Sequence, residues 1–157
     1  MVAERAAPLA ELVAAKTGQT LRQFAAERIF RPLGMSRTLF YDDHEEIVPG
    51  RAYSYGPRRG DGFQKKVLSF ANVGATSLFT TATDLAKWLA YLGTIDGSDL
   101  ARLMQTRLVL NSGIQHAYAG GLSVREHRGL RLIDHTGSDA GYRSYCGRYP
   151  DQGLGIA

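Results

Sequence analysis

The sequence predicts an α+β domain in which helices come first along the chain and an antiparallel sheet comes last. Residues 20–31 and 81–93 place apolar side chains at helical spacing behind capping residues. After residue 117 the pattern changes to short strand-like runs separated by turns. The composition, with 44% hydrophobic and 22% charged residues in a chain of 157, is ordinary for one globular domain. We therefore expect helices packed on an antiparallel sheet.

The first two helices are predicted from the residues at their ends. Pro8 suits a first helical turn and Gly18 suits a C-terminal cap, so a short helix is expected between them. Residues 20–23, TLRQ, match a capping box. The apolar face that follows continues until Pro32-Leu33-Gly34, where we expect the second helix to end.

The middle of the chain combines an irregular segment with two further helices. Residues 35–75 keep no period, which predicts a long excursion with one short strand at 67–70. A cap of the Thr-x-x-Asp type at 81–84 begins a helix that ends at Gly93, and another helix begins at Ser98. The side chains expected to face inward are Leu85, Trp88, Leu89 and Leu92 in the first of these helices, and Leu100, Leu103 and Met104 in the second.

The end of the chain is predicted to form an antiparallel meander. Residues 127–129 separate two strand-like runs, and residues 150–153, PDQG, form a turn in which proline presets one dihedral angle and glycine tolerates a positive one. A finished edge strand usually carries charge, so the apolar end of the chain predicts truncation inside the sheet. The strands expected are 121–124, 130–135, 142–149 and 154–157.

Charge and cysteine content argue against several classes of site. The formal charge of +4 comes from scattered basic residues, with only 58–59 and 65–66 adjacent, so no nucleic-acid interface is expected. Cys146 is the single cysteine, which excludes an internal disulfide, and we interpret it as a buried small residue. The acidic run at 42–46, DDHEE, is interpreted as a solvated segment, so neither a metal nor a cofactor is expected. No apolar run reaches the length of a membrane span.

Three segments carry more information than their spacing alone. Residues 27–38 are ERIFRPLGMSRT, residues 76–88 are TSLFTTATDLAKW, and residues 134–144 are DHTGSDAGYRS. In the same order they resemble the patterns ERIFxPLGMxxT, GLxSTxxDLxxW and HTGGxxGYxS of the β-lactamase-related serine hydrolases. This group includes class C β-lactamases, penicillin-binding proteins and related esterases.

The resemblance implies a transpeptidase-like α+β fold and an acyl-enzyme mechanism on a β-lactam, a D-amino-acid peptide or an ester. The family's nucleophile motif, Ser-x-x-Lys, and its second motif, Tyr-x-Asn, do not occur anywhere in the chain. The third motif is matched by His135-Thr136-Gly137, with histidine in place of the usual lysine. By resemblance, His135 presents a hydrogen-bonding edge near the substrate and Thr136 supplies a hydroxyl. Gly137 allows close approach, and the Ser138 N–H is one oxyanion-hole donor.

The missing motifs lead to the expectation that residues 1–157 form one partial domain, without the nucleophile region and the last strand and helix. Such a chain would be inactive alone, and its unpaired strand edges predict self-association. The intact protein would take a small-molecule or peptide acyl substrate. Two alternatives stay open: a non-catalytic module that binds acyl-D-Ala-like carboxylates, and one half of a split enzyme. The cellular compartment also stays open.

Overall fold

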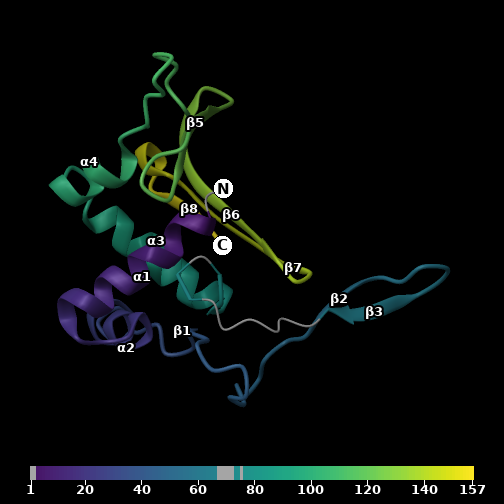
Figure 1. The fold of residues 1–157 in the computed structure, drawn as a ribbon. Coiled ribbons are helices and arrows are strands. Elements are labelled where there is room, and N and C mark those ends of the chain that lie inside the picture. The colour runs from purple at the N-terminus through teal and green to yellow at the C-terminus, as the bar shows by residue number, and fades with distance from the viewer. Residues whose placement is uncertain (1–2, 67–72, 75) are drawn as a thin grey trace. The chain divides into compact units, whose positions relative to one another are not determined.

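A computed structural model of the chain describes residues 3–66, 73–74 and 76–157, and it confirms the α+β class (Figure 1). These residues divide into two compact units. Unit 1 contains the chain up to Asp84 together with the short segment Ser138–Arg143. Unit 2 contains residues 85–137 and 144–157. That all 157 residues form one domain stays a prediction.

Unit 1 begins with a helix that is longer than the sequence predicts. Helix α1 spans Ala3–Thr17 and contains Pro8 in its interior, so the predicted start at Pro8 is wrong. Residues 3–7 include three alanines, the strongest helix former, and this propensity extends the helix although proline removes one backbone hydrogen bond. The predicted end is confirmed, because Gly18 adopts a φ of 71° and its N–H bonds Ala14 O at 2.8 Å.

The second helix has the predicted capping box and an unexpected wide turn. Helix α2, Leu21–Ala25, begins where the Thr20 hydroxyl accepts the Gln23 N–H at 3.2 Å and the Gln23 side chain accepts the Thr20 N–H at 3.0 Å. It continues as the π-helical segment η1, Ala26–Phe30. The helical segment ends at Phe30, and a turn through the predicted Pro32-Leu33-Gly34 stop follows, with Gly34 at a φ of 66°.

Two small antiparallel pairs replace much of the expected irregular excursion. Strand β1, Leu39–Phe40, pairs with β4, Leu78–Phe79. Strands β2, Ser54–Pro57, and β3, Phe63–Lys66, form a hairpin that the sequence did not predict, because its glycine and proline residues conceal the alternating pattern. The strand predicted at 67–70 lies outside the described residues.

The final sheet follows the predicted meander closely. Its strand order is β5-β6-β7-β8, all antiparallel neighbours where the register is given (Figure 1). A short 3₁₀ segment, Pro150–Gln152, and Gly153 at a φ of 63° make the predicted turn before the last strand. The strands are β5, Ser123–His127; β6, Leu130–Asp139; β7, Tyr142–Tyr149; and β8, Leu154–Ile156.

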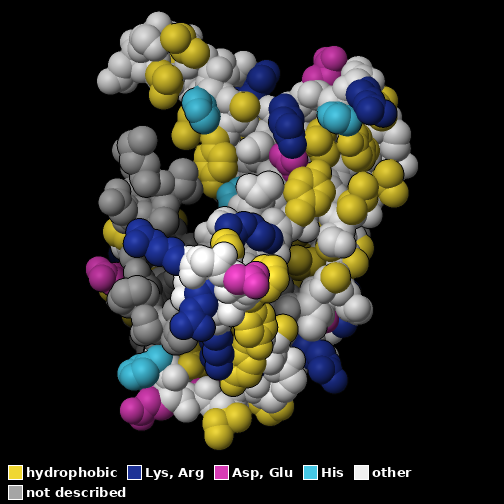
Figure 2. All heavy atoms as spheres, turned by 90° about the vertical axis from the view of Figure 1, so that its right-hand side faces the viewer, with side chains coloured by type: hydrophobic (Ala, Val, Ile, Leu, Met, Phe, Trp, Pro, Cys, Tyr) yellow, Lys and Arg dark blue, Asp and Glu magenta, His cyan; other side chains and the backbone are white. Residues whose placement is uncertain are grey.

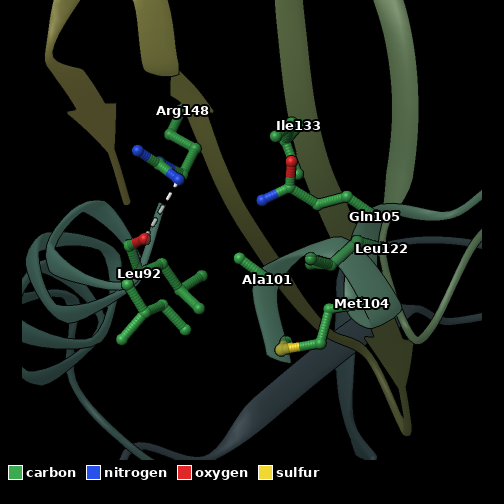
Figure 3. A pocket seen from close by; sticks show the side chains of 8 residues that line it. Leu92, Ala101, Met104, Gln105, Leu122, Ile133 and Arg148 are labelled. Carbon is green, nitrogen blue, oxygen red and sulfur yellow. Dashed lines mark hydrogen bonds between the residues drawn. The ribbon is translucent and has the colours of Figure 1, made fainter. Parts of the chain in front are cut away.

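Within unit 2, one face of this sheet is covered by helices. Helix α3, Ala82–Thr94, enters the unit at Leu85, and α4, Asp99–Gln105, begins at the predicted cap Ser98, whose hydroxyl accepts the Ala101 N–H at 3.1 Å. Side chains from the helices and from the sheet point toward one another in the core of this unit (Figure 3). It is lined by Leu92, Ile95, Ala101, Met104, Gln105, Leu122, Ile133 and Arg148.

The predicted inward face of α4 is partly wrong. Leu100 and Leu103 are 50% and 73% exposed, whereas Ala101 is buried and Met104 lines the core. The small Ala101 lines the core together with Ile133 of the sheet, and the larger leucines on either side of it face away. In α3 the expected face is better placed, since Leu89 and Leu92 are buried and Leu85 and Trp88 are half-buried.

The opposite face of the sheet carries exposed apolar side chains. Arg148 points toward α3, so its neighbours Gly147 and Tyr149, with their partners Ile156 and Leu154, belong to the other face. Leu154 and Ile156 are 52% and 47% exposed. Hydrophobic side chains are also visible among lysines and arginines on the surface drawn in Figure 2. The expected self-association through strand edges stays a prediction. No described helix is both long and apolar enough to cross a membrane.

Candidate functional site

All four predicted site residues lie inside strand β6, although the predicted strand includes only His135. The sequence predicts a strand that stops at His135, because glycine weakens a strand at the next-but-one position. Pairing with β7 carries β6 on to Asp139, so His135, Thr136, Gly137 and Ser138 are all extended residues. Alternation along the strand places the first and third side chains on one face and the other two on the opposite face.

One backbone edge of β6 has no strand partner along this motif among the described residues. The ladder between β5 and β6 runs from the His127–Leu130 pair to the Ser123–Asp134 pair and ends there. In the part of the chain that the structure describes, no strand continues beside His135–Ser138 on the β5 side. The backbone N–H and C=O groups that point this way are available to an extended ligand, which could add to the sheet as a further strand.

His135 has a tyrosine as its side-chain partner. Its Nε2 atom lies 3.1 Å from the hydroxyl oxygen of Tyr118, and the ring centroids are 5.8 Å apart. Burial raises the pKa of Tyr118, so this residue stays a neutral phenol near pH 7. A phenol can donate to an unprotonated Nε2 or accept from a protonated one, which fixes the imidazole in either charge state.

Sequence reasoning missed Tyr118 as a site residue. It lies in the segment before β5, where its N–H bonds His116 Nδ1 at 3.0 Å and its C=O accepts the Leu108 N–H at 3.1 Å. These two bonds and an isolated bridge to Ser123 set the position of the phenol. Nothing in the sequence marks this tyrosine, because its partner is 17 residues away and the intervening pattern is irregular.

Gly137 has a packing role in addition to the expected one. A Cβ atom built at this position would overlap the Ser144 hydroxyl on β7, so glycine leaves room for that side chain. The side chains of Thr136 and Ser138 are exposed. The structure therefore brings His135 together with Tyr118 and Gly137 with Ser144, and it leaves the other two side chains facing solvent.

Two residues next to the motif, Asp134 and Cys146, contact the start of the motif or the neighbouring strand. Asp134 is buried at 3% exposure and forms an ion pair with Arg125 on β5, whose Nε lies 3.2 Å from Asp134 Oδ1. Cys146 on β7 is half-buried, and its thiol lies close enough to the His135 backbone to hydrogen-bond with it.

We predict that Cys146 reacts slowly with thiol reagents. Burial raises the pKa of this thiol, so little thiolate forms at pH 8. Alkylation by iodoacetamide, followed by mass spectrometry, should be at least about tenfold slower in the folded chain than in urea. Equal rates in both conditions would show that the thiol is not protected beside the site strand.

The acidic run at 42–46 binds an arginine. Arg22 of α2 donates to Asp42 Oδ1 at 2.8 Å and to Glu46 Oε2 at 2.6 Å. The hydrogen bond from Arg22 holds the pKa of Glu46 below its usual value. The run is thus tied to α2, and among the described residues no group of three histidine, cysteine or acidic side chains is arranged to hold a metal.

The first two resembling segments meet each other within unit 1. Asp84 is 2% exposed, and its Oδ2 atom accepts the Arg37 N–H at 2.8 Å and the Thr38 hydroxyl at 2.9 Å. Thr38 also hydrogen-bonds Thr80 at 2.8 Å. Thr38 and Asp84 are therefore structural, because they join the segment just before β1 to the start of α3.

Comparison with known proteins adds the family. The model of the family described as Beta-lactamase matches residues 6–157. This chain belongs to the β-lactamase family. The match includes all three segments and the site strand, so the resemblance drawn from those segments is confirmed.

Among curated relatives of this family, D-aminopeptidases of the genus Brucella recur. The protein from Brucella anthropi is 29% identical over 143 residues, covering 90% of this chain and 27% of the relative. The protein from Brucella ovis is 26% identical with the same coverage. This chain thus spans about a quarter of the length of the curated relatives it matches.

Several solved structures share the fold of this chain. A penicillin-binding protein homologue from Pyrococcus abyssi, described as octameric, has a TM-score of 0.79 at 22% identity, covering 94% of this chain and 35% of its own. A D-amino acid amidase from Ochrobactrum anthropi SV3, complexed with L-phenylalanine amide, has a TM-score of 0.73 at 24% identity, covering 92% and 45%. The incomplete β-lactamase/transpeptidase-like fold that the sequence predicts is confirmed.

Proposed function

We propose that strand β6 of this chain binds the acyl substrate of a β-lactamase-family serine hydrolase that acts on D-amino-acid amides or peptides. The observation that carries the proposal is the open backbone edge that begins at His135, where the β5 ladder stops. A peptide or amide substrate is an extended backbone, and such an edge matches its hydrogen-bonding groups. The names of the Brucella relatives support the choice of D-amino-acid substrates.

Each residue of the motif has a role in this proposal. The Ser138 N–H stabilises the oxyanion that forms when the substrate carbonyl is attacked. His135, held by Tyr118 at 3.1 Å, presents an imidazole to the leaving group or to the base that serves the nucleophile. The exposed Thr136 hydroxyl hydrogen-bonds the substrate.

The nucleophile itself would come from outside these 157 residues. The chain contains nine serines, and none is followed by lysine at the third position. A serine hydroxyl needs such a neighbouring base to attack an amide. We therefore propose that the chain alone forms no acyl-enzyme and that activity requires a segment carrying Ser-x-x-Lys, in the same polypeptide or in a second one.

Complementation tests this function. The chain is co-expressed with the N-terminal part of a related D-aminopeptidase that carries Ser-x-x-Lys, and the purified complex is assayed with D-alanine p-nitroanilide. We expect hydrolysis that falls roughly 100-fold or more in His135→Ala, the usual range for losing a proton-transfer group. His127→Ala, an exposed histidine on β5, is the matched control and should keep full activity.

The result also separates the alternatives. A folded complex that hydrolyses nothing would count against a split or truncated enzyme. If N-acetyl-D-alanine then binds the chain saturably, and His135→Ala weakens this binding, the non-catalytic module is the better account. Equal activity of the His135→Ala and wild-type complexes would contradict the role of the site strand.

A further inference from the structure

The turn between β6 and β7 is held by a set of contacts that the proposed reaction does not use. Ala140 and Gly141 form a two-residue turn with φ values of 43° and 90°, the geometry of a tight hairpin. Both residues belong to unit 1, as does the segment that contacts them, Arg51–Ser54. Ser138, the proposed oxyanion donor, lies two residues before the turn in the same unit.

Two hydrogen bonds connect this turn to the segment that leads into β2. The Ser54 hydroxyl donates to Ala140 O and also lies 3.1 Å from Lys66 O. The Tyr142 hydroxyl donates to Ala52 O at 2.8 Å. Ser54 is only 6% exposed, so its bonds are shielded from competing water.

Packing around the turn is equally close. A Cβ atom at Gly141 would lie 3.2 Å from both Ser54 Oγ and Tyr55 O, so the turn and β2 are in direct contact. Arg51, in the segment before β2, is itself packed on two rings, with its guanidinium carbon 4.8 Å from the Phe79 ring centroid and 5.2 Å from that of Tyr41. Burial alone would lower the pKa of Arg51, yet hydrogen bonding with Tyr142 and Tyr41 raises it.

We propose that Ser54 and Tyr142 are positioning residues: by fixing the turn at Ala140–Gly141 they hold the Ser138 amide in the orientation that an oxyanion needs. This proposal rests on the proposed function in one respect, namely that the Ser138 N–H is an oxyanion-hole donor. A hairpin strand attached at one end would otherwise swing at its tip, and an oxyanion-hole donor works only when its direction is preset. Neither residue needs to touch the substrate.

The test measures the backbone motion of Ser138 in the chain by ¹⁵N relaxation. In the wild type we expect an order parameter of about 0.85, typical of rigid backbone, and in Ser54→Ala or Tyr142→Phe a fall toward roughly 0.6. Tyr142→Phe keeps the ring and removes only the hydroxyl with its bonds to Ala52 O and Arg51, so it serves if Ser54→Ala does not fold. The matched control is Ser98→Ala. It also removes a serine hydroxyl that is hydrogen-bonded to the backbone, but this hydroxyl accepts the Ala101 N–H at the start of α4.

The outcomes are distinct from those of the complementation assay. Loss of order at Ser138 in both variants, with the Ser98→Ala value unchanged, supports the proposal even if the complex proves inactive. Loss of order confined to Ala140 and Gly141 would overturn it, as would an unchanged Ser138 in either folded variant. An equal fall in Ser98→Ala would also overturn it, because the effect would then be general destabilisation.

Discussion

Replacing Asp84 by alanine should lower the free energy of unfolding by about 3 kcal/mol, the largest effect that we expect from a single side chain in unit 1. The carboxylate is 2% exposed and accepts both the Arg37 N–H and the Thr38 hydroxyl. Its removal takes this acceptor away from both donors, although the Thr38 hydroxyl keeps Thr80 as a partner. A buried donor left without an acceptor costs about 1–3 kcal/mol. Urea denaturation followed by circular dichroism measures the change.

Two further variants separate the loss of the Asp84 hydrogen bonds from a general effect of losing a negative charge. Thr38→Val removes one of the two donors together with its bond to Thr80, and we expect a smaller loss of about 1 kcal/mol. Asp151→Ala, at an exposed position in the last turn, should leave the midpoint unchanged. If Asp84→Ala were as mild as the Asp151 variant, the network would not stabilise the junction.

Breaking the ion pair between Arg148 and Asp96 should have the second large effect, in unit 2. The Arg148 side chain is 7% exposed and donates to Leu92 O at 3.2 Å and to Asp96 Oδ1 at 2.8 Å, whereas the Asp96 side chain is 38% exposed. Asp96→Asn leaves a buried guanidinium without its counter-charge. Because solvent screens the exposed partner, we expect the free energy of unfolding to fall by about 2 kcal/mol. Breaking a fully buried pair would cost more.

The same pair predicts how stability depends on pH. The hydrogen bond from Arg148 holds the pKa of Asp96 below its usual value in the folded chain. A depressed folded pKa contributes stability above the unfolded pKa of about 4, and that contribution is lost as the pH falls through the folded value. The stability difference between wild type and Asp96→Asn, measured by urea denaturation, should therefore be constant above pH 5 and shrink as the pH falls from 5 to 2.

A matched control is available on the neighbouring helix. Asp99 pairs with Arg102, but its side chain is 94% exposed, so Asp99→Asn should leave the denaturation midpoint unchanged at every pH. A difference between wild type and Asp96→Asn that persisted undiminished at pH 2 would contradict the role given to the carboxylate charge.

Sequence reasoning placed an element well where capping or turn residues mark its end. The capping box at Thr20, the cap at Ser98 and the turn at Gly153 all involve local bonds, so a few residues decide them. The elements it missed depend on distant partners. Strand β2 exists because β3 pairs with it, and β6 extends past Gly137 because β7 does. Propensity was outweighed there by pairing.

The site divides in the same way. The sequence motif in residues 134–144 identified the strand and its four candidate residues. Those candidates were chosen by resemblance to a family, and the match to the family model confirms that family. The open edge at His135 and the phenol of Tyr118 could not be predicted, because both depend on where β5 stops and on how an irregular segment folds back. The roles given to the four residues remain predictions.

The most direct test of the account asks which polypeptide is acylated. The chain alone, and the chain co-purified with an N-terminal segment carrying Ser-x-x-Lys, are incubated with a fluorescent fluorophosphonate and separated on a denaturing gel. We predict no label on the 157-residue chain in either sample, and label on the partner segment that is weakened by His135→Ala and not by His127→Ala. Label on the chain itself would contradict the central claim, because it would place a working nucleophile among its own serines.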